Sequence, residues 1–243
     1  GVDPGNVIIS ADFAQLELRT IAAITGDKTM VELFINGEDL HNFAAKELFG
    51  PDFTKEQRQI AKVFNFSTLY GAGAGTIGLI LLTQTGIKLP EDEINRLKRK
   101  WLNTFSGIAQ WQRQGSTRHE MGVAHRTPHG RRYVSERFTD HLSIENQGAG
   151  AEVARIALHY IDDNLPEGVK LINFIHDSYA AECEANPVVY QKAAKVIHEG
   201  MVYAWERAPF DKHGIPMPVE VGVAHNLKDA DTLSNCLYIY EGK

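Results

Sequence analysis

Two aspartates stand where the chain is expected to change its local structure, and both could bind a metal ion. The apolar run Val7–Ala11 predicts a buried strand, and Asp12 follows it directly, where a helical pattern begins. A second apolar run over 171–175 ends at His176 and Asp177, and a third run then leaves, which predicts a hairpin tip. Each aspartate also has a purely structural interpretation, as a helix N-cap or as a turn residue.

The two carboxylates become neighbours if the hairpin pairs beside the first strand. Carboxylates that share a small site repel each other, and a divalent cation relieves that repulsion. The sequence offers oxygen ligands and no Cys/His cluster at metal spacing, so the donor set favours Mg²⁺ over Zn²⁺. We therefore expect Mg²⁺ near Asp12 and Asp177, with Mn²⁺ as a substitute ion.

A further pattern recurs every four residues over 55–70, a segment that Thr54 and Gln57 mark as a helix through a capping-box pattern. A spacing of four keeps side chains on one broad stripe of a helix. Two cations come first and two aromatic rings follow: Arg58, Lys62, Phe66 and Tyr70. Cations in the first turns oppose the helix dipole, so they do not serve the helix itself. The order suits a nucleotide, with phosphates at one end and a flat base and sugar at the other.

Charge is distributed unevenly along the 243 residues, whose formal net charge is −6. Residues 91–137 hold ten Lys and Arg against five Asp and Glu, and residues 138–243 hold eight against 16. The middle of the chain is therefore the part suited to a polyanion. The run 96–100 fits an exposed helix face equally well. Arg131 lies in a predicted turn rich in arginine, which suits phosphate contact better than a mobile helix face does.

The composition is typical of a globular protein, with 43% hydrophobic and 23% charged residues and two Cys. It excludes a disordered tail, a collagen-like rod and a disulfide-stapled mini-protein. No apolar run approaches the roughly 18 residues of a membrane span, and two Cys favour a reducing compartment. We expect a cytoplasmic rather than a secreted protein, with no membrane partner.

The order of the patterns predicts an α+β fold, in which a small sheet from both ends of the chain flanks an all-helical insertion. Helices are expected at 28–36, 39–49, 55–70, 90–104, 106–121, 140–164 and 187–206, and strands at 7–11, within 123–135 and 169–184, and at 217–224. Glycines over 71–78 predict a flexible exit from the 55–70 helix. Their GxGxxG spacing follows a helix rather than a strand, which argues against a dinucleotide site.

Three segments together resemble motifs of family A (polymerase I-like) DNA polymerases. The segment 12–19 (DFAQLELR) is similar to the first palm motif, 58–71 (RxxxKxxNFSxxYG) to the fingers-helix motif, and 176–178 (HDS) to the last palm motif. The resemblance implies a small antiparallel palm sheet with helices on one face and an inserted all-helical fingers subdomain. It places the palm at 1–24 and 123–243, and the fingers at 25–122.

The resemblance also implies an activity: a DNA-directed DNA polymerase that adds deoxynucleotides to a primer 3′-hydroxyl by two-metal phosphoryl transfer with release of pyrophosphate. Asp12 and Asp177 would bind two Mg²⁺ ions with help from the Phe13 carbonyl, and Lys62 would take part in catalysis. The implied nucleotide-binding residues are Glu17, His41, Arg58, Lys62, Phe66 and Tyr70. The implied DNA contacts are Arg131, Gln147 and His176.

Two residues depart from the family pattern. Ser178 stands where the family usually has Glu, and Ser67 stands where it usually has Gly. The missing carboxylate predicts reduced or retuned activity rather than its loss, because the two aspartates that would hold the metals remain. Glu182, on the strand that follows the hairpin tip, is expected to compensate in part.

The resemblance covers nearly all of this chain but only the C-terminal part of a typical member. The partners it implies are primer-template DNA and deoxynucleoside triphosphates, in a bacterial or virus-infected cell. A thumb, an upstream palm segment or an exonuclease is expected as a separate chain or a removed part, and activity is expected to depend on it. The alternative is a non-catalytic nucleic-acid-binding remnant or accessory subunit of a split polymerase. A metal-dependent nuclease is disfavoured, because nuclease chemistry does not need the stripe of cations and rings.

Overall fold

A computed structural model describes residues 2–242 and divides them into two compact units. The sheet unit runs up to Leu18 and also contains Ala149–Asp211 and the residues from Pro216 onward. The helical unit contains Arg19–Gly148 together with Lys212–Ile215. Two helices, α1 and α8, contribute residues to both units. No helix within residues 2–242 is both long enough and apolar enough to cross a membrane.

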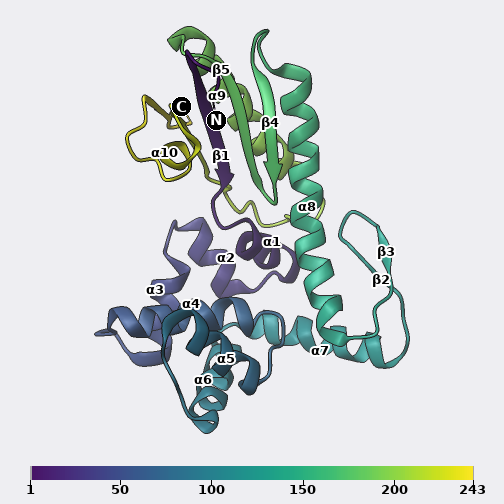
Figure 1. Ribbon diagram of the computed structural model, residues 1–243. Coiled ribbons are helices and arrows are strands. Elements are labelled where there is room, and N and C mark those ends of the chain that lie inside the picture. Colours follow the sequence, from purple (N-terminus) through teal and green to yellow (C-terminus); the bar gives the residue numbers. More distant parts are fainter. Residues whose placement is uncertain (1, 243) are drawn as a thin grey trace. The chain divides into compact units, whose positions relative to one another are not determined.

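The sheet unit is built on a five-stranded antiparallel sheet (Figure 1). Its strand order is β4-β5-β1-β6-β7. The bounds are β1 Asn6–Phe13, β4 Lys170–Ile175, β5 Ser178–Glu184, β6 Val219–Ala224 and β7 Tyr238–Tyr240. The β4–β5 hairpin therefore pairs beside β1, which is the condition under which Asp12 and Asp177 become neighbours. The α+β class, with its antiparallel sheet and helical insertion, is confirmed.

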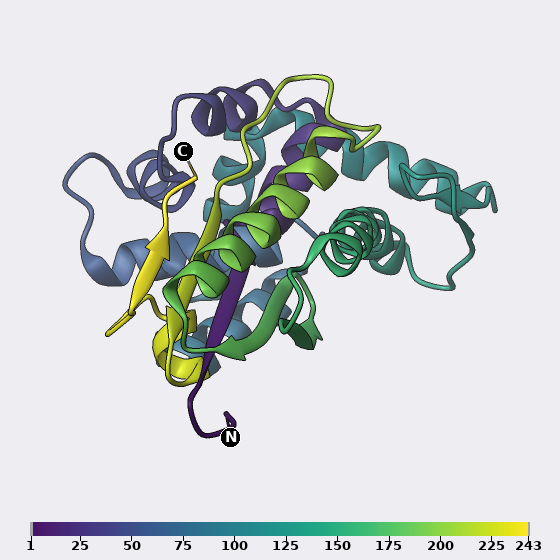
Figure 2. The same ribbon diagram turned by 90° about the horizontal axis from the view of Figure 1, so that it is seen from above.

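Residues alternate between the two faces of β1, because successive strand side chains point to opposite sides. On one face Val7, Ile9 and Phe13 are 0%, 0% and 1% exposed. The long helix α9 (Pro187–Glu206) lies along this sheet (Figure 2). Pro187 occupies the first turn of α9, where its missing N–H costs nothing. This apolar contact fixes which side of β1 is core and which side is free to carry polar groups.

The opposite face of the sheet carries a short helix that the sequence did not predict, α10 (Leu227–Asp231). Its first turn is capped by Asn226, and Ala230 packs on Ile8 and Ala224. Gly222 permits this close seating, since a Cβ there would lie 2.4 Å from the Ala230 carbonyl oxygen. The seating places Asp231 above β1, where its carboxylate accepts a hydrogen bond from the Ser10 hydroxyl.

The helical unit consists of consecutive helices and one small hairpin. The helices are α1 Leu16–Thr25, α2 Lys28–Ile35, α3 Leu40–Phe49, α4 Lys55–Ser67, α5 Ala74–Thr85, α6 Glu91–Thr104, α7 Ser106–Glu120 and α8 Phe138–Asn164, and the hairpin pairs β2 His125–Arg126 with β3 Arg132–Tyr133. Asp27 caps α2 by accepting from the Met30 N–H, and its other oxygen accepts from the Gly107 N–H. One carboxylate thus ties α2 to the start of α7.

Two expectations about this region were wrong. The helix α4 ends at Ser67 and not at residue 70, and the glycine-rich segment after it contains helix α5 rather than a flexible exit. Ile77 and Leu81, four residues apart, are both fully buried on one face of α5. Burial of that face stabilises the helix despite its glycines. Strand β7 was also missed.

The close seating of α10 gives a first testable prediction. Gly222→Ala should lower the free energy of unfolding by about 1–3 kcal/mol, because the added Cβ overlaps the Ala230 carbonyl. Urea unfolding would measure the loss. Gly75→Ala is the matched control, since a Cβ at this α5 position meets nothing within 4 Å. It should leave stability unchanged or raise it by about 0.5–1 kcal/mol. Equal destabilisation by both substitutions would contradict the packing argument.

Candidate functional site

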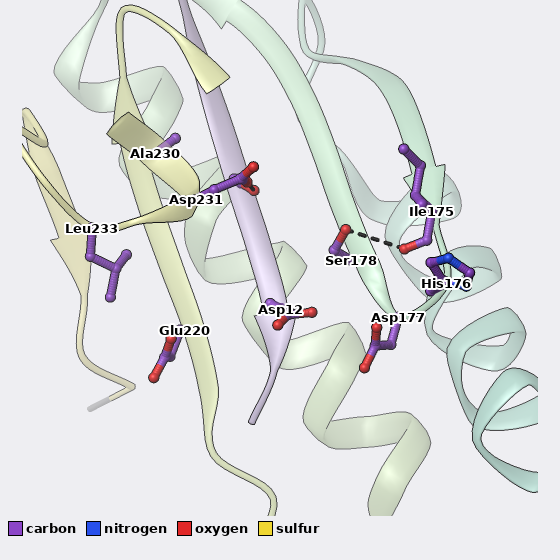
Figure 3. A pocket seen from close by; sticks show the side chains of 10 residues that line it. Asp12, Ile175, His176, Asp177, Ser178, Glu220, Ala230, Asp231 and Leu233 are labelled. Carbon is purple, nitrogen blue, oxygen red and sulfur yellow. Dashed lines mark hydrogen bonds between the residues drawn. The ribbon is translucent and has the colours of Figure 1, made fainter. Parts of the chain in front are cut away.

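A cavity of about 260 Å³ lies at the end of the sheet where β1 stops and the β4–β5 hairpin turns (Figure 3). Asp12 enters it from β1, and His176 and Asp177 enter from the hairpin turn. His176 adopts a φ of 56°, which gives this two-residue turn its tight reversal. The other lining residues are Ser10, Ile175, Ser178, Glu220, Ala230, Asp231 and Leu233. The two aspartates thus share one cavity, as the sequence analysis expects.

Negative charge is concentrated around Asp12. The strand register places Asp12 directly opposite Ser178 on β5 and opposite Glu220 on β6. The pKa of Asp12 is raised to about 6 by partial burial and by the charges of Asp177 and Glu220. The hydrogen bond from the Phe13 backbone N–H opposes this shift. Burial also raises the pKa of Asp177, although its own N–H and His176 oppose the shift. A bound cation would favour the ionised form of both carboxylates.

The residues of the cavity fit a magnesium site. Four carboxylates line it, from Asp12, Asp177, Glu220 and Asp231, and no Lys or Arg is among the described lining residues. Nowhere in residues 2–242 do three His, Cys, Asp or Glu side chains gather into a complete metal-binding group. Carboxylate oxygens suit Mg²⁺, which keeps several waters and uses one or two carboxylates plus substrate phosphates.

Two more predicted residues lie beside this cavity. The Phe13 ring is 1% exposed and packs edge-on against Tyr179, so its backbone carbonyl is the group it can offer a ligand. Glu17 lies in the first turn of α1, and its charge contributes to the raised pKa of Asp177. The structure therefore brings Glu17 into the electrostatic environment of the paired aspartates.

Glu182 does not take the place that the sequence analysis gave it. It pairs with Ile8, four residues along β5 from Ser178, and it is not a lining residue of the cavity. Its carboxylate accepts hydrogen bonds from the Asp3 N–H and the Asn6 side chain, both at 2.9 Å. The expected compensation by Glu182 is therefore wrong, because strand geometry directs it to the far end of the sheet.

A second cavity, of about 570 Å³, lies in the helical unit between α4 and α5. Lys62, Phe66 and Tyr70 line it together, although Tyr70 stands in the turn beyond the end of α4. The Tyr70 hydroxyl accepts a hydrogen bond from the Asn146 side chain at 2.9 Å. Ser67, the residue found where the family usually has Gly, is buried in the same wall and donates to the Val63 carbonyl.

Arg58 stands apart from the other three residues of the predicted stripe. Its guanidinium donates to the Asp39 carboxylate at 2.8 Å and to the Asn42 side chain at 2.5 Å. Asp39 is the N-cap of α3. Burial opposes ionisation of Asp39, but the Asn42 N–H and the Arg58 guanidinium outweigh it and lower the pKa. This contact connects α4 to the start of α3 and orients the arginine.

His41 belongs to a buried network that the sequence analysis did not identify. Its Nδ1 lies 2.8 Å from the Asn65 side-chain nitrogen, and the Asn65 oxygen accepts from the Trp101 indole N–H at 2.7 Å. Asn65 is 0% exposed. With Asn65 as donor, His41 carries its proton on Nε2. Burial lowers the pKa of His41, which favours the neutral ring. The sequence signal that could have indicated this network is Asn65 itself, a single polar residue on the apolar face of α4.

The remaining predicted DNA contacts lie on the β2–β3 hairpin and on α8. Arg131 is exposed in the turn, where its N–H donates to the Thr127 hydroxyl and the Thr127 N–H donates to its carbonyl. Gln147 is exposed on α8 and accepts from Ser143 at 3.0 Å. Gly148 adjoins Gln147, and a Cβ there would lie 3.1 Å from the Thr127 methyl group. Close packing therefore holds Arg131 and Gln147 on neighbouring elements.

Three histidines anchor this hairpin to the helices. The His125 ring stacks on His141 of α8, with 3.7 Å between ring centroids, and His141 Nε2 lies 2.8 Å from His119 Nδ1 of α7. The Tyr133 hydroxyl of β3 donates to the His141 carbonyl at 2.9 Å. Burial and the positive charges of His141, Arg118 and His119 lower the pKa of His125 to about 4. The His125 ring is therefore neutral at pH 7.

The sequence of this chain was compared with models of known protein families. The family model described as DNA polymerase family A matches residues 2–229. The chain belongs to DNA polymerase family A. The resemblance inferred from the three motifs is thereby confirmed.

Two curated DNA polymerases are similar to this chain in sequence, and one solved polymerase domain is similar to it in fold. DNA polymerase I of Aquifex aeolicus is 32% identical over 190 residues, covering 75% of this chain and 33% of that protein. The DNA polymerase of Mycobacterium phage D29 is 32% identical over 147 residues, covering 60% of this chain and 23% of that protein. The POL domain of Pol1 from M. smegmatis, solved with DNA primer-template and dNTP, matches with a TM-score of 0.79 and 23% identity, over 95% of this chain and 41% of that one. This chain spans a quarter to a third of the length of these curated relatives.

The buried network of this family A chain gives a second prediction. Asn65→Leu should lower the free energy of unfolding by about 2–4 kcal/mol, because it leaves the Trp101 N–H and His41 Nδ1 without their partner. Chemical unfolding followed by tryptophan fluorescence would measure it. Asn103→Leu, an exposed position on the same helix as Trp101, is the control and should change stability by less than about 0.5 kcal/mol. Equal losses would show that the network contributes nothing specific.

The histidine stack gives a third prediction, for the pH dependence of stability. His125 has a pKa of about 4 when folded and about 6.5 when unfolded. The unfolded chain therefore binds more protons between these values, and stability present above pH 6.5 is lost as the pH falls toward 4. The loss should be on the order of 2 kcal/mol. Urea unfolding at pH 7 and pH 4.5 should show a smaller loss for His125→Phe, whose ring takes no proton. The same loss in both proteins would assign the effect to other groups.

Proposed function

We propose that this chain is the part of a DNA polymerase that adds deoxynucleotides to a primer 3′-hydroxyl under the direction of a template. In this reaction the primer oxygen forms a bond to the α-phosphorus of the nucleotide, and the bond to pyrophosphate breaks. The observation that supports it most strongly is the shared cavity of Asp12 and Asp177 in a chain of family A.

The sheet unit is proposed to hold the reacting centre. Asp12, Asp177 and the Phe13 carbonyl would hold two Mg²⁺ ions. When bound, these ions lower the pKa of the primer hydroxyl and neutralise charge on the leaving pyrophosphate. His176, which lines the same cavity, is assigned to the primer end. Glu17 is assigned to the sugar, where its side chain would leave no room for a 2′-hydroxyl.

The helical unit is proposed to recognise the nucleotide. Arg58, Lys62 and His41 would hold the triphosphate, and Lys62 would also stabilise negative charge that develops during transfer. The contact with Asp39 supports this role for Arg58, because a guanidinium already oriented by one carboxylate loses less conformational entropy when it meets a phosphate. Phe66 is assigned to the sugar and base, and Tyr70 to the template position.

Primer-template DNA and deoxynucleoside triphosphates are the proposed partners. Arg131 and Gln147 are assigned to the duplex. We keep the division into a palm at 1–24 and 123–243 and fingers at 25–122 as part of the proposal. The thumb and any exonuclease would come from another part of the protein or from a partner chain, in the cytoplasm of a bacterial or virus-infected cell.

A non-catalytic nucleic-acid-binding role is the second candidate, and Ser178 is the observation that favours it. The family usually has a carboxylate at this position, and here the hydroxyl donates to the Ile175 carbonyl at 3.2 Å. A polymerase subunit that has lost activity would retain DNA binding without extending a primer.

Primer extension by the complete protein distinguishes these roles and is the fourth prediction. The native protein should extend a primer in the presence of Mg²⁺. Asp12→Ala and Asp177→Ala should each reduce the rate by about 10³-fold or more, because several kcal/mol of charge stabilisation disappears. Asp163→Ala, an exposed acid near the end of α8 and outside the cavity, is the matched control and should extend normally.

Two other outcomes would contradict parts of this proposal. Duplex binding without extension by the native protein would favour the non-catalytic role. Normal extension by both cavity variants would exclude the metal assignment.

A further inference from the structure

Because Ser178 replaces the usual Glu, one carboxylate is missing beside Asp12. The Ser178 hydroxyl turns back to the Ile175 carbonyl, so the hydrogen bond closes the hairpin instead of facing the carboxylates (Figure 3). Glu182 cannot replace this carboxylate, because its own carboxylate accepts hydrogen bonds from the Asp3 N–H and the Asn6 side chain away from the cavity. The question is which acidic group occupies the neighbourhood of the paired aspartates instead.

The strand register identifies one. Asp12 faces Ser178 across one ladder and Glu220 across the other, so the three residues form a single row over β5, β1 and β6. Residues directly opposite each other on antiparallel strands share a face and have Cβ atoms about 4.5–5.5 Å apart. Glu220 therefore stands at the same level of the sheet as Ser178, on the other side of Asp12. Both residues line the cavity that contains Asp177.

The backbone of Glu220 is well fixed while its side chain is exposed. Its neighbours Val219 and Val221 are 8% and 0% exposed on the core face of the sheet. Asp231, the fourth carboxylate of the cavity, already accepts a hydrogen bond from Ser10. Among residues 2–242, no hydrogen bond or ion pair to the Glu220 carboxylate is found. Glu220 thus has acceptor oxygens available at the cavity.

We propose that Glu220 is a positioning residue that supplies the carboxylate missing at Ser178, by accepting hydrogen bonds from water bound to the Mg²⁺ at Asp12 and Asp177. The inference rests on the proposed function, since it concerns the same metal site. Mg²⁺ keeps several of its waters in protein sites, and carboxylates that hold such outer groups tune the affinity for the metal. An outer role also agrees with the absence of a third side chain close enough to be a direct ligand in the described residues.

A double-mutant cycle tests this inference on the complete protein. Glu220→Gln removes the charge and keeps the shape, and Ser178→Glu restores the carboxylate that the family usually has. Mn²⁺ binding without nucleotide, followed by electron paramagnetic resonance, gives a readout independent of activity. Glu220→Gln should weaken Mn²⁺ affinity about tenfold in the native background, as outer carboxylates typically do. In the Ser178→Glu background the same substitution should weaken it less than about threefold, because one carboxylate substitutes for the other.

Two further variants separate charge from position. Glu220→Asp keeps the charge and should retain most of the Mn²⁺ affinity. Glu182→Gln removes the same charge from the same face of the sheet, opposite Ile8 and four residues along β1 from Asp12, and should leave affinity unchanged. Circular dichroism melting would verify that every variant is folded.

The outcomes are distinct from those that test the proposed function. If Glu220→Gln leaves Mn²⁺ affinity unchanged, or weakens it by the same factor in both backgrounds, the inference is overturned even if the native protein extends primers. A larger effect of Glu182→Gln than of Glu220→Gln would also overturn it. If the native protein binds Mn²⁺ but does not extend primers, the result would instead count against the proposed function alone.

Discussion

The repulsion among carboxylates at one end of the central strand is the constraint on which the site depends. Asp12 cannot move away from its acidic neighbours, because β1 is hydrogen-bonded on both sides and its other face is buried. A shift of one residue in register would turn Val7 and Ile9 away from the core face packed by α9, at a cost that exceeds any relief of charge. The core therefore holds the negative charges together, which raises the pKa of Asp12 to about 6, and a bound cation would stabilise the ionised carboxylates.

Local pattern was enough to predict the elements that carry Asp12 and Asp177. An apolar run that leads to Asp12, and a hairpin that turns at His-Asp, are signals contained within a few neighbouring residues. The pairing of β5 with β1 was only a condition at that stage, and the structure shows it. Glu220 left no comparable signal, because a Glu in an alternating strand has the pattern of an ordinary solvent-facing residue. Its importance comes from register between strands far apart in the chain, which no local pattern determines.

The α4 stripe shows where a periodicity argument reaches its limit. Spacing alone places Arg58, Lys62, Phe66 and Tyr70 on one face, on the assumption that the helix continues to residue 70. The chain instead leaves the helix after Ser67 and turns through Gly71 at a φ of 74°. Tyr70 nevertheless lines the cavity with Lys62 and Phe66, because Asn146 holds its hydroxyl. Arg58 was separated from the group by partners on α3 that no helical periodicity could reveal.

Under the proposed function, the net charge of −6 conceals two different means of binding phosphate, one in each unit. In the helical unit, arginines stand on a hairpin whose His125 ring is neutral at pH 7, so under the proposed function that unit would contact a polyanion through Arg and Lys directly. The cavity of the sheet unit is lined by four carboxylates and by no Lys or Arg among the described residues, so under the proposed function phosphate would approach it together with a metal ion. The acidic excess after residue 137 is therefore compatible with a nucleic-acid partner, because part of it forms the site that needs the metal. Whole-chain charge limits non-specific binding, whereas the placement of a few charges determines the specific chemistry.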